Sequence, residues 1–204
     1  MQNIIFDLGG VLLDLKLEAS QKAFQCNNRS TLLPPMLSWM SGPLIAAYEI
    51  NAIDTKEFRS KIRELLINPE LSDETIDAAW CAMLGNIPRI KFELLKDLKH
   101  KYRLFLFSNT NEMHVGHFEP QFEQQYGIPI QKMFDIIFYS HEIQDRKPNL
   151  SAFEKVIAIA KINPANTIFI DDNPDNVKAA SAAGLRAGYY DPATDLTEYV
   201  LGLV

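Results

Sequence analysis

The sequence contains few of the features that mark secreted, membrane-bound or nucleic-acid-binding proteins. Only two of its 204 residues are cysteines, and the spacing of Cys26 and Cys81 matches no metal-binding motif, so we expect reduced structural thiols. No apolar run approaches the ~20 residues of a membrane-spanning helix, and the chain begins with a strand-like segment where a leader would lie. Basic residues are outnumbered 20 to 26 by acidic ones, which argues against a nucleic-acid partner. We therefore expect a cytoplasmic protein that binds neither a membrane nor a nucleic acid.

Glycine and proline, at 9 and 11 residues, are too few to indicate disorder. Hydrophobic residues make up 47% of the chain, which is enough to build a full core. The length fits one ordinary domain, or a core domain that carries a sizeable insertion.

The order of apolar segments predicts an α/β protein. Short runs rich in Ile, Leu and Phe are typical of strands that are buried on both faces, and amphipathic helices are expected between them. Strands that alternate with helices at this spacing predict a Rossmann-like, doubly wound parallel sheet. The expected strands cover residues 3–6, 103–107, 135–139, 167–170 and 186–190, and the expected helices cover 90–101, 112–126 with an interruption at Pro120, 150–161 and 174–183.

A long segment without a convincing strand separates the first two strands. At about 70 residues it is too long for a single crossover helix, so we predict an inserted all-helical subdomain of residues 15–88 in an α/β core of residues 1–14 and 89–204. Asp54 and Ser72 are expected to cap two of its helices. The expected helices of the insert cover residues 17–26, 35–48, 55–67 and 73–84.

Polar residues stand where three of the expected strands end, and one more stands in a charged loop expected over residues 140–148. Because the carboxyl ends of parallel strands lie at one edge of a sheet, these groups can converge although they are far apart in the chain. Several carboxylates in one cleft must be neutralised by protons or by a cation, and oxygen ligands favour a hard ion such as Mg²⁺. The residues are Asp7, Ser108, Lys147, Asp171 and Asp172, with Asp175 as a further carboxylate.

Four segments in this order, IIFDLGGVLLD, LFSNT, RKP and IFIDDNPDN, resemble the four motifs of the haloacid dehalogenase superfamily. The resemblance covers nearly the whole chain, and the DLG opening followed by a small residue is similar to that of bacterial sugar-phosphate phosphatases of the glucose-1-phosphate type. Residues 15–88 then resemble the helical cap that follows the first strand in one subfamily. The resemblance implies a Mg²⁺-dependent phosphatase whose partner is a small phosphate ester, such as a sugar phosphate, in a monomer or weak homodimer.

The resemblance also implies a nucleophile and a metal site. Asp7 attacks phosphorus and forms an aspartyl-phosphate. The other oxygen of Asp7, the backbone carbonyl of Gly9 and the carboxylate of Asp172 hold Mg²⁺. Asp171 acts on the metal mostly through bound water.

A phosphate-binding group is implied by the two middle motifs. Ser108 and the backbone amides after it bind the phosphoryl oxygens, and Asn109 lines the same loop. Lys147 neutralises charge on both the nucleophile and the phosphate. Positioning and charge stabilisation of this kind supply most of the catalysis in phosphoryl transfer.

The sequence departs from the family pattern at Gly9, where most phosphatases of the superfamily carry an Asp that protonates the leaving group. Such a general acid contributes roughly 10²–10⁴ in rate, so its loss favours leaving groups that need little protonation, such as anomeric sugar phosphates, or a proton from water. The same loss argues against a phosphomutase. Asp14 is a candidate substitute acid, but capping of the first inserted helix is the favoured role for it.

Two alternatives to the phosphatase stay open. A 2-haloacid dehalogenase also uses an Asp nucleophile, but the acidic pair Asp171–Asp172 gives it no advantage. A non-catalytic binding module is kept open by Gly9. His114 and His117 resemble a metal pair only weakly, and a polar helix face is the favoured interpretation.

The helical insert is expected to decide substrate choice. Residues 47–53 resemble a turn of the cap, in which Asn51 can adopt a left-handed conformation. The candidates to face the cleft are Trp39, Tyr48 and Glu49, although Trp39 and Tyr48 are equally suited to the core of the insert.

Overall fold

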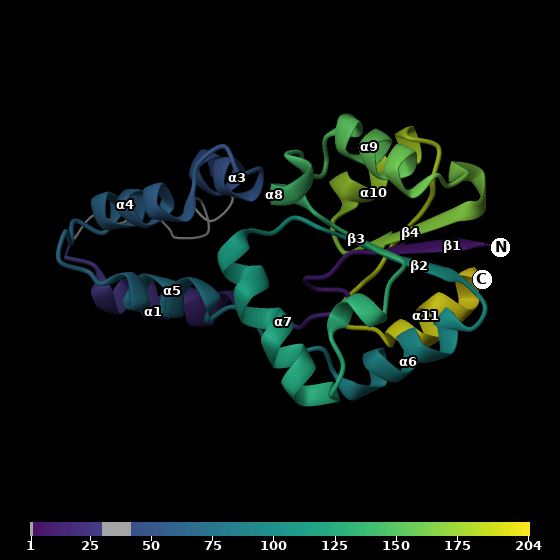
Figure 1. The fold of residues 1–204 in the computed structure, drawn as a ribbon, viewed down its shortest axis with the longest axis horizontal. Helices are drawn as coiled ribbons and strands as arrows, with labels where there is room; N and C mark the ends of the chain where they lie inside the picture. Colours follow the sequence, from purple (N-terminus) through teal and green to yellow (C-terminus); the bar gives the residue numbers. More distant parts are fainter. Residues whose placement is uncertain (1, 30–41) are drawn as a thin grey trace.

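The computed structural model describes residues 2–29 and 42–204, which form an α/β core and a separate helical lobe, at the right and left of Figure 1. Five parallel strands build the core sheet in the order β3-β2-β1-β4-β5. This order confirms the predicted doubly wound parallel sheet. The strands are β1 (Asn3–Phe6), β2 (Arg103–Ser108), β3 (Ile136–Tyr139), β4 (Thr167–Asp171) and β5 (Arg186–Tyr189).

Helices cover both faces of the sheet, which explains why its central strands are continuously apolar. Along β1, Ile4 and Phe6 belong to the hydrophobic cluster on one face and Ile5 to the cluster on the other. Helices α6 (Arg89–Lys99), α7 (Glu112–Tyr126) and α11 (Leu196–Leu203) cover the first face, and α9 (Leu150–Ala160) and α10 (Pro174–Ala182) cover the second (Figure 1).

The register of the central strand aligns the ends of its neighbours. Phe6 is paired with Leu106 of β2 on one side and with Ile170 of β4 on the other. The backbone N–H of Asp7 donates to the Ile170 carbonyl at 2.9 Å, which extends the pairing by one residue. The polar residues that end these three strands therefore converge at one edge of the sheet, as the sequence predicted.

The helical lobe consists of four described helices with a hydrophobic cluster of their own. Phe24, Phe58 and Trp80 lie at the centre of this cluster. Asp54 and Ser72 cap two of the helices by accepting backbone N–H bonds, as predicted. The predicted helix start at residue 35 and the candidate Trp39 lie outside the described residues. The four helices are α1 (Leu17–Asn27), α3 (Pro43–Glu49), α4 (Thr55–Leu65) and α5 (Asp73–Cys81).

The chain enters and leaves the helical lobe through two segments that lie side by side. Leu15 and Leu84 form an isolated antiparallel bridge, and the Gly85 N–H donates to the Asp14 carbonyl at 2.8 Å. The helical insert is thus attached to the core by a paired connection. Its predicted boundaries at residues 15 and 88 stay a prediction.

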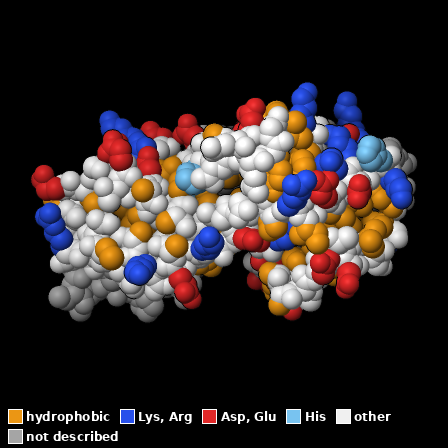
Figure 2. Space-filling view, turned by 90° about the horizontal axis from the view of Figure 1, so that it is seen from below, with side chains coloured by type: hydrophobic (Ala, Val, Ile, Leu, Met, Phe, Trp, Pro, Cys, Tyr) orange, Lys and Arg blue, Asp and Glu red, His pale blue; other side chains and the backbone are white. Residues whose placement is uncertain are grey.

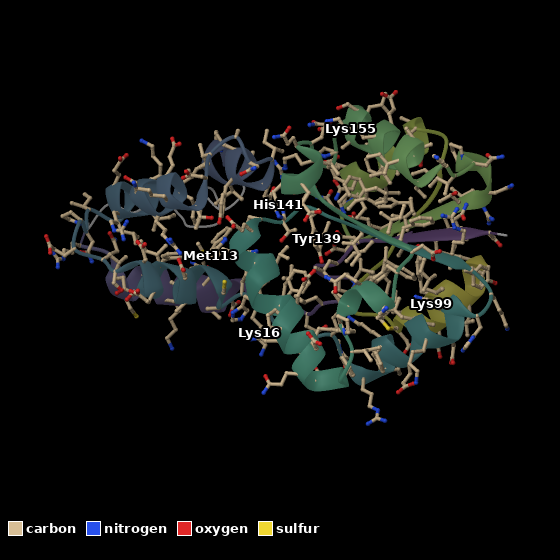
Figure 3. All side chains as sticks on the ribbon, in the orientation of Figure 1. Lys16, Lys99, Met113, Tyr139, His141 and Lys155 are labelled. Atoms are coloured by element: carbon tan, nitrogen blue, oxygen red, sulfur yellow. The ribbon has the colours of Figure 1, made fainter. Side chains whose placement is uncertain are left out.

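The lobes also contact each other through side chains. The Thr55 hydroxyl of α4 donates to Glu112 of α7 at 2.9 Å, and Met113 packs against the hydrophobic cluster of the helical lobe. Figure 3 labels Met113 on α7 and His141 on α8 (Ser140–Ile143), where the core faces the helical lobe. These contacts fix how the two lobes close over the sheet edge.

Two predicted details of the secondary structure are wrong, and one helix was not predicted. Helix α7 runs unbroken through Pro120, because Phe118 and Phe122 on either side of the proline are buried in the core and hold the helix in place. The predicted loop over residues 140–148 begins with α8, and α11 was not predicted. Two short 3₁₀ helices, η1 (Ile130–Lys132) and η2 (Pro164–Asn166), complete the core.

The molecular surface carries charges of both signs. Figure 2, a view from below, shows acidic and basic side chains interspersed over both lobes. Both cysteines are free thiols, as predicted, with Cys26 exposed and Cys81 buried. Among the described helices, none has the length and apolar character needed to cross a membrane.

Candidate active site

A cavity of about 440 Å³ lies at the carboxyl edge of the sheet, between the core and the helical lobe. This volume is typical of sites for small molecules. Asp7, Ser108 and Asp172 line the cavity from the core, and Glu49 and Trp80 line it from the helical lobe. The predicted motifs and the helical insert thus meet around one space.

Lys147 lies at the base of this cavity, buried between two carboxylates. Its Nζ donates to Asp7 Oδ1 at 2.5 Å and to Asp171 Oδ2 at 2.6 Å, and only 1% of the side chain is exposed. Burial alone lowers the pKa of Lys147, but the charges of Asp7 and Asp171 outweigh burial and raise the pKa above its usual value. Lys147 is therefore a buried cation that organises the site.

The carboxylates around Lys147 carry more negative charge than one lysine can balance. Ligand oxygens of Asp7, Asp171 and Asp172 all lie within 4.8 Å of one another. Burial raises the pKa of Asp7 to about 7, opposed by Lys147 and assisted by Asp171. Burial also raises the pKa of Asp172, and the charge of Asp171 adds to the effect. A cluster of carboxylate oxygens that resists ionisation fits a hard divalent cation such as Mg²⁺.

Asp175 does not belong to this cluster. It is exposed in the first turn of α10, whose N-cap is Asn173. The prediction of Asp175 as a cleft carboxylate is therefore wrong, because α10 turns its side chain away from the sheet edge.

Asp171 is fully buried and held by several donors. Asn176 Nδ2 lies 3.0 Å from both carboxylate oxygens, and the Asn173 N–H donates to Oδ1 at 2.8 Å. Because Lys147 binds it as well, Asp171 is fixed in one orientation. Asn176 is the last residue of the segment IFIDDNPDN, but the sequence pattern indicated no role for it. Its contact with Asp171 forms only when α10 folds back over the end of β4.

Two adjacent glycines let the backbone approach Asp172. Gly10 has a φ of +81°, and a Cβ there would lie 2.1 Å from Asp172 Oδ2. Gly9 lines the cavity, and a Cβ there would meet only the end of the Leu15 side chain, at 3.0 Å. The positive φ and this close approach therefore require glycine at position 10.

Ser108 and Asn109 lie at the end of β2, on the cavity wall. The Asn109 side chain is bound to the backbone of Lys147: its Nδ2 donates to the Lys147 carbonyl at 2.8 Å, and its Oδ1 accepts from the Lys147 N–H at 2.9 Å. Asn109 thus positions Lys147 with its side chain. Its predicted contact with phosphate stays a prediction.

Asp14 lies away from this chemistry. Its carboxylate pairs with Lys91 at 3.1 Å and does not line the cavity. It also caps no helix, since α1 begins at Leu17 after Lys16. Both roles considered for Asp14 are wrong, because the chain stays extended past it and forms the paired connection to the helical lobe.

His114 lies on the cavity wall and is not part of a polar helix face. It is buried and stacked on Trp80, with ring centroids 4.8 Å apart. Burial lowers the pKa of His114 to about 3, so the ring is neutral at ordinary pH. His117 contacts Gln121 instead, so the predicted polar face is wrong for His114 and the two histidines share no ligand position.

Glu49 reaches the cavity from the end of α3, as predicted for one of the cap residues. Arg146 Nε lies 2.9 Å from Glu49 Oε2, and burial raises the pKa of Glu49 against the effect of Arg146. Asn51 has a φ of 56°, the left-handed conformation expected in this turn. Tyr48 points instead into the helical lobe, where it stacks on Phe58. Arg146 lies in the quoted RKP segment, but no sequence pattern indicated its pairing with Glu49.

Comparison with known proteins assigns this arrangement to a family. The family described as haloacid dehalogenase-like hydrolase matches residues 1–184. The D-ribitol-5-phosphate phosphatase of Bacteroides thetaiotaomicron is 24% identical over 187 residues, covering 91% of this chain and 90% of that protein. The phosphoglycolate phosphatase of Vibrio vulnificus is 29% identical, covering 89% and 79%. A solved HAD family enzyme of B. thetaiotaomicron, complexed with magnesium and inorganic phosphate, is 31% identical with a TM-score of 0.89, covering 98% of both chains.

Proposed function

Since the chain belongs to the haloacid dehalogenase-like hydrolases, we propose that it is a Mg²⁺-dependent phosphatase that hydrolyses a small phosphorylated metabolite through an aspartyl-phosphate on Asp7. The observation that carries the proposal is the Lys147 ammonium, buried between Asp7 and Asp171 at the base of a cavity. The named phosphatase relatives, and the solved relative with magnesium and phosphate, support the same conclusion.

The residues at the sheet edge suit two successive displacements at phosphorus. In the first, an oxygen of Asp7 bonds to phosphorus, the bond to the leaving oxygen breaks, and that oxygen takes a proton from water. In the second, a water molecule bonds to phosphorus and gives a proton to the hydroxide left by the first step, and the bond to Asp7 breaks, releasing inorganic phosphate. Ser108 and Lys147 hold the phosphoryl oxygens and their charge through both steps.

Asp7, Asp172 and the carbonyl of Gly9 are the proposed ligands of Mg²⁺, with Asp171 acting through water. The fit rests on the three clustered carboxylates and on the raised pKa of Asp7 and Asp172. When bound, Mg²⁺ supplies positive charge that stabilises the anionic transition state. The protein's own part is to hold the carboxylates in place, which Asn176 does for Asp171.

The missing acid at Gly9 raises the question of leaving-group preference. If water is the proton donor, anomeric sugar phosphates are hydrolysed faster than primary-alcohol phosphates. The relative named for D-ribitol 5-phosphate gives this preference no support, since that ester is formed on a primary alcohol. Equal rates for the two classes of ester would overturn the idea.

A non-catalytic binding module is the second candidate, and Gly9 is the observation that favours it. The dehalogenase alternative lacks such an observation, because the carboxylate cluster calls for a cation that dehalogenation does not use. Action in the cytoplasm, a monomeric or weakly dimeric state, and the division into a core and a cap at residues 15 and 88 stay predictions.

The test is phosphate release from a panel of sugar phosphates, polyol phosphates and p-nitrophenyl phosphate, with Mg²⁺ and with EDTA. We expect Asp7→Asn to lower release by about 10³-fold or more, because it removes the nucleophile. Asp14→Asn is the matched control and is expected to retain activity within about twofold. Mg²⁺ binding without turnover of any ester would favour the binding module.

A further inference from the structure

The part of the cavity wall that comes from the helical lobe is almost entirely apolar. Ile45, Trp80 and Met83 are among its residues, and Glu49 is the only charged side chain that the described residues of the lobe place there. The phosphate-binding groups belong to the core, so this wall faces the organic part of a substrate. The Glu49 carboxylate is therefore the main polar group on the wall that faces the leaving group of the substrate.

The Glu49 carboxylate is held in place but incompletely bonded. Only 14% of the side chain is exposed. Burial raises the pKa of Glu49, and the ion pair with Arg146 opposes this effect and favours the charged form. The buried Oε2 receives no aligned hydrogen bond from the described residues, despite its 2.9 Å distance to Arg146 Nε. A buried carboxylate is stable only when donors satisfy its oxygens. Glu49 therefore has capacity to accept hydrogen bonds from a ligand.

No spare cation faces the same space in the described part of the chain. Lys147 is the only lysine or arginine on the described cavity wall, and it is already bound to Asp7 and Asp171. Arg146 is paired with Glu49. His114 is neutral because of its burial. A second anionic group on the substrate would find no counter-ion here.

Building on the proposed phosphatase function, we propose that Glu49 selects esters whose organic part is uncharged and hydroxylated, such as polyol phosphates, and rejects those that carry a carboxylate. A polyol donates its O–H groups to Glu49 and packs its C–H groups on the apolar wall. A carboxylate in the same place faces a like charge in a buried setting, where repulsion is strong. The two named relatives differ in this respect, since phosphoglycolate carries a carboxylate and D-ribitol 5-phosphate does not.

The experiment compares kcat/KM for D-ribitol 5-phosphate, phosphoglycolate and p-nitrophenyl phosphate, with Mg²⁺, in the native protein and in Glu49→Gln. The native protein is expected to prefer the polyol ester over phosphoglycolate. In Glu49→Gln that preference is expected to fall by about tenfold or more, because the repulsion is lost and a charged acceptor becomes neutral. The rate with p-nitrophenyl phosphate is expected to change by less than about threefold.

Glu112→Gln is the matched control. It makes the same chemical change at a carboxylate that joins the lobes through Thr55 but does not line the cavity. It is expected to leave the substrate preference unchanged. A preference that stays within about twofold in Glu49→Gln, or an equal loss on all three esters, would overturn the proposal, since the second result means that Glu49 acts only by closing the lobes.

If the protein is not a phosphatase at all, the experiment gives a result that differs from failure of the Glu49 proposal. In that case neither the native protein nor any variant releases phosphate from p-nitrophenyl phosphate or any other ester. Dissociation constants of D-ribitol 5-phosphate and phosphoglycolate, measured by calorimetry with Mg²⁺ on the native protein and Glu49→Gln, then still test selection by Glu49. An unchanged ratio of the two constants would overturn it, and a tenfold shift would support it.

Discussion

Lys147 and His114 illustrate how burial gives opposite results for two basic side chains on one cavity wall. Lys147 is surrounded by Asp7 and Asp171, whose charges outweigh the cost of burial and keep the ammonium charged. His114 has no carboxylate in contact and rests on the ring of Trp80, so burial dominates and the ring is neutral. The charge of each side chain thus follows from its neighbours rather than from its type.

The neutral state of His114 makes stability depend on pH. Its pKa is about 3 in the fold and near 6.5 in an unfolded chain, so between these values the unfolded state binds a proton that the fold excludes. The free energy of unfolding is therefore expected to fall as pH drops below 6.5, by up to about 1.4 kcal/mol per pH unit from this residue. Urea unfolding at pH 7, 6 and 5 measures the slope.

Two variants isolate this contribution. His114→Gln is expected to show a shallower loss of stability toward acid than the native protein, because the titrating group is gone. His117→Gln removes a histidine of the same helix that contacts Gln121. It should retain most of the native slope, because burial, and not the smaller effect of His117, is the largest cause of the lowered pKa of His114. Equal slopes in the native protein and His114→Gln would contradict the prediction.

Helix α7 shows how an element can tolerate residues that oppose it. It contains Pro120 in its interior and Gly116 one turn earlier, and it ends at Gly127, whose φ is +73°. The buried faces of Phe118 and Phe122 supply the packing that holds the helix together across the missing backbone bond. Tertiary packing therefore overrides the local signal for a break.

The two glycines of this region are expected to respond in opposite directions to alanine. A Cβ at either one would meet no atom within 4 Å, so only the backbone conformation distinguishes them. Gly116→Ala is expected to stabilise the protein by about 0.5–1 kcal/mol through helix propensity. Gly127→Ala is expected to destabilise it by about 1–2 kcal/mol, since L-residues disfavour the left-handed region. Thermal unfolding measures both, and a shift of the same sign in both variants would contradict the argument.

At the scale of the whole molecule, the site joins elements that are distant in sequence. Asp7 follows β1, Asp172 follows β4, and the helical lobe covers them from the other side of the cavity. A ligand that binds the assembled cluster binds the folded state alone. Its binding energy is then added to the stability of the fold.

Mg²⁺ is accordingly expected to raise the unfolding temperature. At about 100 times its dissociation constant a ligand adds about 2.7 kcal/mol, which for a chain of this length is roughly 5–10 °C. Asp172→Asn is expected to lose most of this increase, whereas the exposed Asp175→Asn should keep it. Scanning fluorimetry with and without Mg²⁺ measures the effect, and an equal increase in Asp172→Asn would argue against the proposed ligand set.

The local pattern of the sequence determined the elements and most of the candidate residues. Apolar runs marked the five strands because strands buried on both faces need apolar residues at every position, and the polar residues after them marked the functional edge. The end of each strand, to within one residue, and the capping residues Asp54 and Ser72 depend on a few neighbours along the chain, so sequence alone could predict them.

The tertiary structure decided which of those residues act together. Asp14 and Asp175 carry the same carboxylate as Asp7 and Asp172, and only the path of the connection and the turn of α10 take them away from the cavity. The contact of Glu49 with Arg146 joins segments that are far apart in the sequence, and the contact of Asn176 with Asp171 forms only when α10 folds back over the end of β4. The physical reason is that burial and charge pairing depend on distances in space, which are set by the packing of the whole chain.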